Sequence, residues 1–367
     1  MSLFTRFAGV LTDTLVDRLV VHSQKWNLIR VFGDHEVETD QKLLDMPQET
    51  AKETIGVVGF PFSKGQPRNG AEQGPSVLRK AGIVSNLQSL GINVVDHGDV
   101  DIDLVPRDEP MKNVRNPRSV AAANKKLSDT VVKLVKMKQS VLVLGGDHSM
   151  AIGSIHGHAQ AEPNLVVVWV DAHADINTPL TSSTGNIHGM PLSFLVKELE
   201  EFVPKTPGFE WCKPCISVRD LVYIGLRDVD PAERLIIEKF GIFAYSMQEV
   251  DRYGIREVVE RALYQIDPSG VRPIHLSFDV DAMDPTLTPA TGTPVPGGLS
   301  LRESFYLAEE IANTGRLSVL DIAEVNPLLS TEEKKELTAN NTVDVVTKFY
   351  GCRRQGNAPP DYVLPRP

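Results

Sequence analysis

The stretch LVVVWVDAHADINTP, residues 165–179, joins six apolar residues directly to an aspartate, a histidine and a second aspartate at every other position. Successive side chains of a strand point to opposite faces, so Asp171, His173 and Asp175 share one face as long as the backbone stays extended. Two carboxylates on one face at the end of a buried run cost stability unless a positive charge lies between them. The stretch therefore predicts a buried strand that ends at a cation.

Short β-branched runs like this one recur from about Ile55 onward and alternate with helical patterns. The expected strands are IGVVGF, INVVDH, VLVLGG, LVVVWV, LVYIGL, IFAYS, PIHLSF and RLSVLDI. Helical periodicity predicts helices over residues 119–138, 191–201, 255–265, 301–313 and 331–350. Strands that alternate with helices are typical of a parallel sheet covered on both faces. We therefore expect an α/β fold, a three-layer α/β/α sandwich around a mainly parallel eight-stranded sheet.

The domain prediction is an N-terminal extension over residues 1–54 and one catalytic domain over residues 55–367, because no change of composition divides the second region. The first 30 residues are amphipathic at helical spacing and contain three arginines, which indicates a mitochondrial transit peptide, whereas Asp13 and Asp17 count against it. The acidic segment that follows predicts a solvated helix or linker. The predicted compartment is therefore either the cytoplasm or the mitochondrion.

Size and charge exclude several classes of protein. The 367 residues, 41% of them hydrophobic, suffice for a sizeable core, so disorder of the whole chain is excluded. A net charge of -10 argues against nucleic acid or an anionic membrane as a partner. No apolar run approaches the roughly 18 residues of a spanning helix. We expect no nucleic-acid partner and no membrane span.

The cysteines form a sparse, odd-numbered set that fits a reducing compartment better than a disulfide framework. They are Cys212, Cys215 and Cys352. The first two have the spacing of a redox pair, but they lie in a proline-rich loop rather than beside a helix start. Free thiols are the favoured interpretation.

Polar clusters follow three of the expected strands directly. They are Gly145-Gly146-Asp147-His148, the group Asp171, His173 and Asp175, and the pair Asp279 and Asp281. Ligands of open parallel sheets bind outside the carboxyl ends of the strands, so these clusters are expected to converge. Two imidazoles with four of these carboxylates, Asp171, Asp175, Asp279 and Asp281, in one cleft predict a binuclear metal site.

The types of ligand limit which metal ion the site would bind and which reaction it would catalyse. A majority of carboxylates with some imidazole and no cysteine favours Mn²⁺, while Zn²⁺, Fe²⁺ and Co²⁺ stay open. Two divalent ions about 3.5–4 Å apart can bridge a water and lower its pKa, which predicts metal-assisted hydrolysis. Taken singly, His148 could be a turn histidine, and Asp171 or Asp279 a helix cap. For Asp228 and Asp230, loop solvation or capping of a helix at Pro231 is a competing interpretation.

Six longer segments resemble the arginase family of manganese ureohydrolases. They are GGDHSMAIGS, WVDAHADINTP, GNIHGMP, YIGLRDVDP, LSFDVDAMDPTLTPATGTP and LDIAEVNP. The resemblance implies hydrolysis of L-arginine to L-ornithine and urea, by attack of a manganese-bridging hydroxide on the guanidinium carbon. It implies two Mn²⁺ ions per subunit, one held by His148, Asp171, Asp175 and Asp279, the other by His173, Asp171, Asp279 and Asp281.

The resemblance also implies roles for residues around the metals. Glu324 would receive the guanidinium, and Asp175 would pass a proton to the leaving amine. His188 would shuttle protons with solvent or assist the leaving group. The α-carboxylate of the substrate would be held by Asn177, Thr184 and Asn186. The α-amino end would be read by Asp228, Asp230 and Glu233, and Thr293 is a further expected substrate contact.

The sequence departs from the family pattern at two positions, and other functions stay open as alternatives. Met190 and Pro296 stand where the family often has other residues, which affects the expected substrate affinity more than activity. Charged positions that resemble the subunit contacts of the family predict a homotrimer: Asp251, Arg302, Glu303 and Arg354. The alternatives are another ureohydrolase, such as an agmatinase or a guanidino-acid hydrolase, and a catalytically silent interaction protein on the same scaffold.

Overall fold

The computed structural model describes residues 54–357 and residue 363. The predicted extension over residues 1–54 lies outside the described residues except for Thr54, so the boundary and the transit peptide stay predictions.

The described residues form one parallel sheet of eight strands in the order β2-β1-β3-β8-β7-β4-β5-β6. The strands are β1 Thr54–Gly59, β2 Asn93–Asp99, β3 Gln139–Leu144, β4 Val166–Val170, β5 Leu221–Leu226, β6 Phe243–Ser246, β7 Ile274–Asp279 and β8 Leu317–Ala323. Each coincides with one of the predicted runs, and the predicted parallel sheet is confirmed. Its central strands are buried on both sides because both faces are covered.

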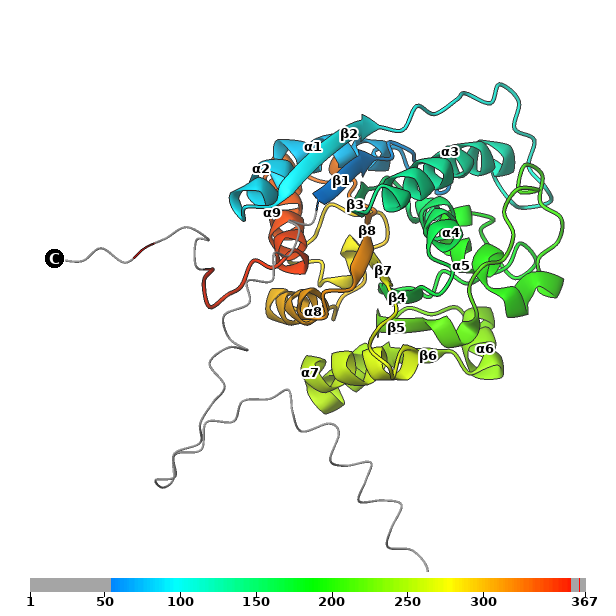
Figure 1. The fold of residues 1–367 in the computed structure, drawn as a ribbon. Coiled ribbons are helices and arrows are strands. Elements are labelled where there is room, and N and C mark those ends of the chain that lie inside the picture. The colour runs from blue at the N-terminus through cyan, green and yellow to red at the C-terminus, as the bar shows by residue number, and fades with distance from the viewer. Residues whose placement is uncertain (1–53, 358–362, 364–367) are drawn as a thin grey trace, which may run out of the picture. The chain divides into compact units, whose positions relative to one another are not determined.

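Helices cover both faces of the sheet (Figure 1). They are α1 Gly74–Lys80, α2 Ile83–Ser89, α3 Pro117–Lys136, α4 Ala151–Ala161, α5 Pro191–Leu195, α6 Pro231–Phe240, α7 Met247–Ile266, α8 Leu301–Asn313 and α9 Glu332–Phe349. One hydrophobic cluster joins α3, α4, α5 and α6 to one face, and a second joins α1, α2, α7, α8 and α9 to the other. Along β3, Val141 and Val143 belong to the first cluster and Leu142 and Leu144 to the second, as strand alternation requires.

Two of the predicted helices differ from the observed ones. The prediction of a helix over residues 191–201 is wrong, because α5 ends at Leu195 and Val196 turns to extended dihedral angles and forms a bridge to Ile216. A short 3-10 helix, Lys197–Phe202, follows. The helix predicted from residue 255 begins earlier, at Met247, and is interrupted at Gly254, whose φ of 77° is readily adopted by glycine.

Within the described part of the chain, no helix has an apolar stretch long enough to cross a membrane.

Candidate metal centre

The predicted polar clusters meet at the carboxyl ends of four neighbouring strands, β3, β8, β7 and β4. The chain leaves β3 through Gly145 and Gly146, where a side chain at position 146 would clash with the carbonyl of Phe62. This close approach brings His148 to the strand ends. The turn after β4 supplies Asp171, His173 and Asp175, and the turn at the end of β7 supplies Asp279 and Asp281.

The reason given for grouping Asp171, His173 and Asp175 is wrong, although the residues do lie together. Strand β4 ends at Val170, so the three side chains are not placed by strand alternation. The chain turns instead, and Asp175 adopts a left-handed backbone with φ of 49°. Such a conformation is uncommon for aspartate and costs of order 1–3 kcal/mol. The turn aims the carboxylate of Asp175 at His148.

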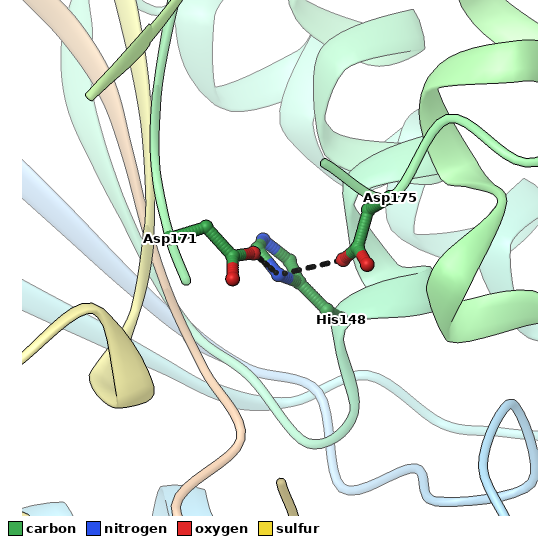
Figure 2. Close-up of side chains that lie close together, drawn as sticks. All are labelled: His148, Asp171 and Asp175. Atoms are coloured by element: carbon green, nitrogen blue, oxygen red, sulfur yellow. Dashed lines mark ion pairs between the residues drawn. The ribbon is translucent and has the colours of Figure 1, made fainter. Parts of the chain in front are cut away.

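The first group of ligand-type atoms surrounds the Nδ1 atom of His148 (Figure 2). This nitrogen lies 3.1 Å from Asp171 Oδ2, 3.3 Å from Asp175 Oδ2 and 3.2 Å from Asp279 Oδ2. Although three carboxylates surround it, the buried Nδ1 atom makes no hydrogen bond of good geometry within the described residues. A nitrogen lone pair that shares its surroundings with three carboxylates is the donor arrangement of a metal site.

The second group is built on the other oxygen of Asp171. His173 Nδ1 lies 3.3 Å from Asp171 Oδ1 and 3.3 Å from Asp281 Oδ2. Asp171 therefore contributes to both groups, each of which has ligand atoms within 4.8 Å of one another. Asp279 contacts His148 but belongs to neither of these groups of three, while its Oδ1 accepts a hydrogen bond from the Asp281 amide at 2.8 Å.

The charges of the cluster fit a pair of divalent cations. Burial, with repulsion from Asp171, raises the pKa of Asp175 to about 6. Burial, with repulsion from Asp281 and Asp171, raises the pKa of Asp279 well above its ordinary value. These acids resist ionisation because they crowd together, and a bound cation would relieve the repulsion. Carboxylate oxygens with imidazole nitrogens suit Mn²⁺.

Trp169 supports the first group, the one around His148. Its indole Nε1 donates a hydrogen bond to Asp171 Oδ2 at 3.0 Å. Its ring stacks on the imidazole of His148, with centroids 4.2 Å apart and planes 12° apart. From its sequence context, Trp169 is expected only in a buried strand. Its position two residues before Asp171 is the signal that places it beside the site.

His188 and Glu324 form a pair beside the cluster. Glu324 Oε1 lies 3.1 Å from His188 Nδ1 and accepts a hydrogen bond from the His148 amide at 2.9 Å. Burial lowers the pKa of His188, but Glu324 outweighs it and the pKa rises to about 9. Glu324 has a φ of 65°, so its backbone is also left-handed. The predicted residue pair is thus brought together at the end of β8.

Residues expected at the far end of the substrate form a second set of contacts. Asn177 Nδ2 donates a hydrogen bond to Asp230 Oδ2 at 2.9 Å. Asp230 is the N-cap of α6, as the competing interpretation held, and its amide donates to Glu233 at 3.0 Å. Glu233 also accepts from the Ile176 amide at 3.1 Å, which ties α6 to the turn after β4. Burial, with repulsion from Asp175, raises the pKa of Glu233 to about 8.

The remaining predicted substrate contacts are more exposed. The hydroxyl of Thr184 accepts a hydrogen bond from the Asn186 amide at 3.3 Å. Asp228 lies 3.9 Å from His173 Nε2, and its side chain is 69% exposed. Thr293 Oγ1 donates to Asp281 Oδ2 at 3.1 Å, so it contacts a candidate ligand directly.

The two departures from the family pattern lie in different surroundings. Met190 is fully buried in the cluster that covers one sheet face, whereas Pro296 is exposed. The cysteines are free, and burial raises the pKa of Cys215 to about 12 and that of Cys212 further. The interpretation as unreactive free thiols is consistent with these surroundings.

Comparisons with known proteins agree with this site. The chain matches the Arginase family over residues 53–351. It is 56% identical to arginase-1 of Sus scrofa over 315 residues, which are 85% of this chain and 98% of that protein. It is 54% identical over 305 residues to a Homo sapiens protein named arginase-2, mitochondrial, covering 83% of this chain and 86% of the relative. The solved structure of arginase from Bacillus caldovelox is 37% identical, with a TM-score of 0.75, and the match covers 82% of this chain and 99% of that one.

Proposed function

This chain belongs to the arginase family and hydrolyses L-arginine to L-ornithine and urea, and we propose that the reaction takes place at the metal centre described above. The main support for this proposal is the carboxylate of Asp171. Asp171 offers one oxygen to the group around His148 and the other to the group around His173, so a single buried carboxylate joins two candidate cation positions. That arrangement suits hydrolysis by a pair of divalent ions.

We propose that the cofactor is two Mn²⁺ ions per subunit. The residues that would hold them are His148, Asp171, His173, Asp175, Asp279 and Asp281. When bound, the two ions supply the chemistry of hydrolysis, since they lower the pKa of a shared water and orient it towards an electrophilic carbon. Asp279 and Asp171 would contact both ions, while Asp281 and Asp175 would each contact one.

Three residues of the chain would orient the guanidinium end of the substrate and transfer protons there. A planar guanidinium pairs well with a carboxylate, so Glu324, which is 2% exposed, would orient it. Asp175 would carry a proton to the leaving amine, since its carboxylate belongs to the cluster and lies 3.3 Å from His148 Nδ1. His188 has a 19% exposed side chain and would exchange protons with solvent.

Selectivity for L-arginine comes from the other end of the substrate. Asn177, Thr184 and Asn186 would hold the α-carboxylate, directly or through water. The α-ammonium would be attracted by the acidic set Asp228, Asp230 and Glu233, with Thr293 as a further contact. Agmatine lacks the α-carboxylate and would leave the donors unpaired. Hydrogen bonds to a charged group contribute roughly 1.5–3 kcal/mol each, and shared water reduces the sum to about 3–4 kcal/mol, a factor of roughly 10²–10³ in kcat/KM.

The test is urea release from L-arginine and from agmatine by the full chain loaded with manganese, with the metal content measured in the same samples. We expect two ions per subunit and a preference for L-arginine. Equal hydrolysis of agmatine would replace the assignment by that of an agmatinase. A chain that holds manganese but releases no urea would point to the silent interaction protein.

We also propose a homotrimer. The charged positions Asp251, Arg302, Glu303 and Arg354 support it by their resemblance to subunit contacts in the family. Within the chain, Arg354 pairs with Glu309 at 2.8 Å. Light scattering of the full chain checks the mass.

For the compartment, we propose that residues 1–53 decide between mitochondrion and cytoplasm. The Homo sapiens relative is named arginase-2, mitochondrial. The basic, amphipathic first 30 residues of this chain support the same destination. Fusing residues 1–53 to a fluorescent protein tests it, and a cytoplasmic fusion would reject the transit peptide.

A further inference from the structure

A row of buried polar side chains lies between the sheet and α4, behind the metal centre. It begins at His148, whose Nε2 lies 2.9 Å from the hydroxyl of Ser277 on β7. Ser277 in turn donates to Asp321 Oδ2 on the neighbouring strand β8, at 3.4 Å. None of these three side chains is accessible to solvent. A carboxylate within a buried strand is costly unless several donors compensate it.

Asp321 receives its donors on one oxygen. Besides Ser277, the hydroxyl of Ser154 on α4 donates to Oδ2 at 2.5 Å, and His275 Nε2 lies 2.9 Å from the same atom. Oδ1 is buried and has no hydrogen-bond partner within the described residues. Three donors that converge on one oxygen indicate an ionised carboxylate, since a protonated oxygen would accept fewer.

The row continues from His275 towards the surface. His275 Nδ1 lies 3.1 Å from His158 Nδ1, and His158 Nε2 lies 2.9 Å from Glu162 Oε2. Glu162 also accepts a hydrogen bond from Ser318 at 2.8 Å, and its side chain is 31% exposed. The row therefore links a half-exposed acid to the metal centre along the face of the sheet that α4 covers.

The hydrogen bonds of this row require one proton more than two neutral imidazoles and two ionised carboxylates supply. Three hydrogen bonds join Glu162, His158, His275 and Asp321, and each requires one proton. Two ionised carboxylates supply none, and two neutral imidazoles supply two. The third proton has to lie on one of the rings or on an acid.

The surroundings of each group locate this third proton. Asp321 is ionised by the argument above, and the hydrogen bond from His158 lowers the pKa of Glu162, so neither acid holds it. Burial lowers the pKa of His158 to about 4, which leaves that ring neutral near pH 7. His158 then donates from Nε2 to Glu162 and accepts at Nδ1 from His275. His275 donates from both nitrogens and is an imidazolium.

We propose that His275 is a buried imidazolium paired with Asp321, and that this ion pair positions His148 through Ser277. The consequence for His148 is a fixed tautomer. The hydroxyl of Ser277 donates its only proton to Asp321, so its oxygen can only accept a hydrogen bond from His148 Nε2–H. With the proton on Nε2, the Nδ1 atom of His148 offers its lone pair to a metal ion bound beside Asp171, Asp175 and Asp279. This inference rests on the proposed role of His148 as a metal ligand. Partners of this kind typically change metal affinity by about 10–100-fold.

The test uses the full chain with ¹⁵N-labelled histidine, kept free of metal, so that NMR reports ring protonation directly. The sequence has nine histidines, and single His→Gln variants assign the signals. At pH 7 we expect two N–H groups on His275. In Ser277→Ala, the Mn²⁺ dissociation constant should rise about 10–100-fold.

Two variants control for packing. Ser277→Thr keeps the hydroxyl and should restore manganese affinity. Ser304→Ala removes another buried hydroxyl, one that donates to the Ser300 carbonyl in α8, and should leave manganese affinity unchanged. In Asp321→Asn, His275 should become neutral. If that variant does not fold, the NMR spectrum of the wild-type chain and the comparison of Ser277→Ala with Ser277→Thr still test the proposal.

The outcomes separate this inference from the proposed function. A neutral His275 in the wild-type chain, or wild-type manganese affinity in Ser277→Ala, would overturn the positioning role while hydrolysis of L-arginine still stands. A wild-type chain that binds no manganese would refute the metal centre, and would overturn the positioning role with it.

Discussion

Replacing Glu324 by glutamine should lower the pKa of His188. Glutamine has nearly the same shape and still offers a carbonyl oxygen to the His148 amide, but it removes the negative charge that lies 3.1 Å from His188 Nδ1. Histidine in water has a pKa near 6.5, and in this protein the pKa of His188 is raised to about 9. The variant therefore isolates the electrostatic part of this contact.

The size of the effect follows from that shift. A rise of about 2.5 pKa units corresponds to roughly 3.4 kcal/mol of preference for the protonated ring, at about 1.36 kcal/mol per unit. Asp175 and Asp147 contribute part of it, so Glu324→Gln should lower the pKa of His188 by about one to two units, or roughly 1.4–2.7 kcal/mol. The His188 side chain is mostly buried, so solvent screens the interaction only partly.

The sign of the stability change follows from the direction of the shift. A histidine whose pKa is raised on folding adds stability that is fully present below about pH 6.5 and is lost as the pH rises through about 9. The wild-type chain should therefore lose stability relative to Glu324→Gln between these two pH values.

The assay is an NMR titration of ¹⁵N-labelled histidine in the metal-free chain, together with urea unfolding at pH 6 and pH 10. Asp147→Asn is a matched control, because it removes a charge that raises the pKa of His188 less than Glu324 does. An unchanged pKa of His188 in Glu324→Gln would show that burial and the other acids, rather than Glu324, set its protonation.

Three further predictions concern metals, selectivity and the extension. Asp171→Asn should lose both manganese ions and nearly all activity, whereas Asp281→Asn should retain part of one ion's occupancy; equal losses by metal analysis would contradict the bridging role. Asp230→Ala should weaken L-arginine turnover with near-wild-type manganese content and cost about 1 kcal/mol of stability as a lost helix cap; a matching loss of metal would place Asp230 in the metal shell instead. Deleting residues 1–53 should leave urea release intact, and an inactive, unfolded product would show that the extension packs on the catalytic domain.

The strands were the most predictable part of the fold, because continuous apolar runs next to polar strand ends are hard to confuse with loops. Helix α4 was missed, since Ala151–Ala161 is buried on nearly all sides, contains buried polar residues and glycines, and lacks an amphipathic stripe. The helix predicted over residues 191–201 failed at Val196, where pairing with Ile216 outweighed local helical periodicity. Local patterns do not contain such long-range contacts.

The candidate ligands were found from the sequence because they follow strands at whose ends ligands commonly bind. The geometry that joins them could not be predicted, because it depends on a left-handed turn at Asp175 rather than on strand alternation. The supporting groups were also missed. Asp321 looked like one polar residue in the run RLSVLDI, and nothing local indicates that His275, Ser154 and Ser277 converge on it.

The strand order constrains how this protein can be synthesised. Because β8 lies between β3 and β7, the middle of the sheet stays open until residue 323 has left the ribosome. Until then β3 and β7 are bare edges, which can pair with other chains. Manganese would not close this gap, because His148 follows β3 and reaches the ligands that follow β4 and β7 only across β8. Chains truncated before β8 should therefore aggregate or be degraded whether or not metal is supplied.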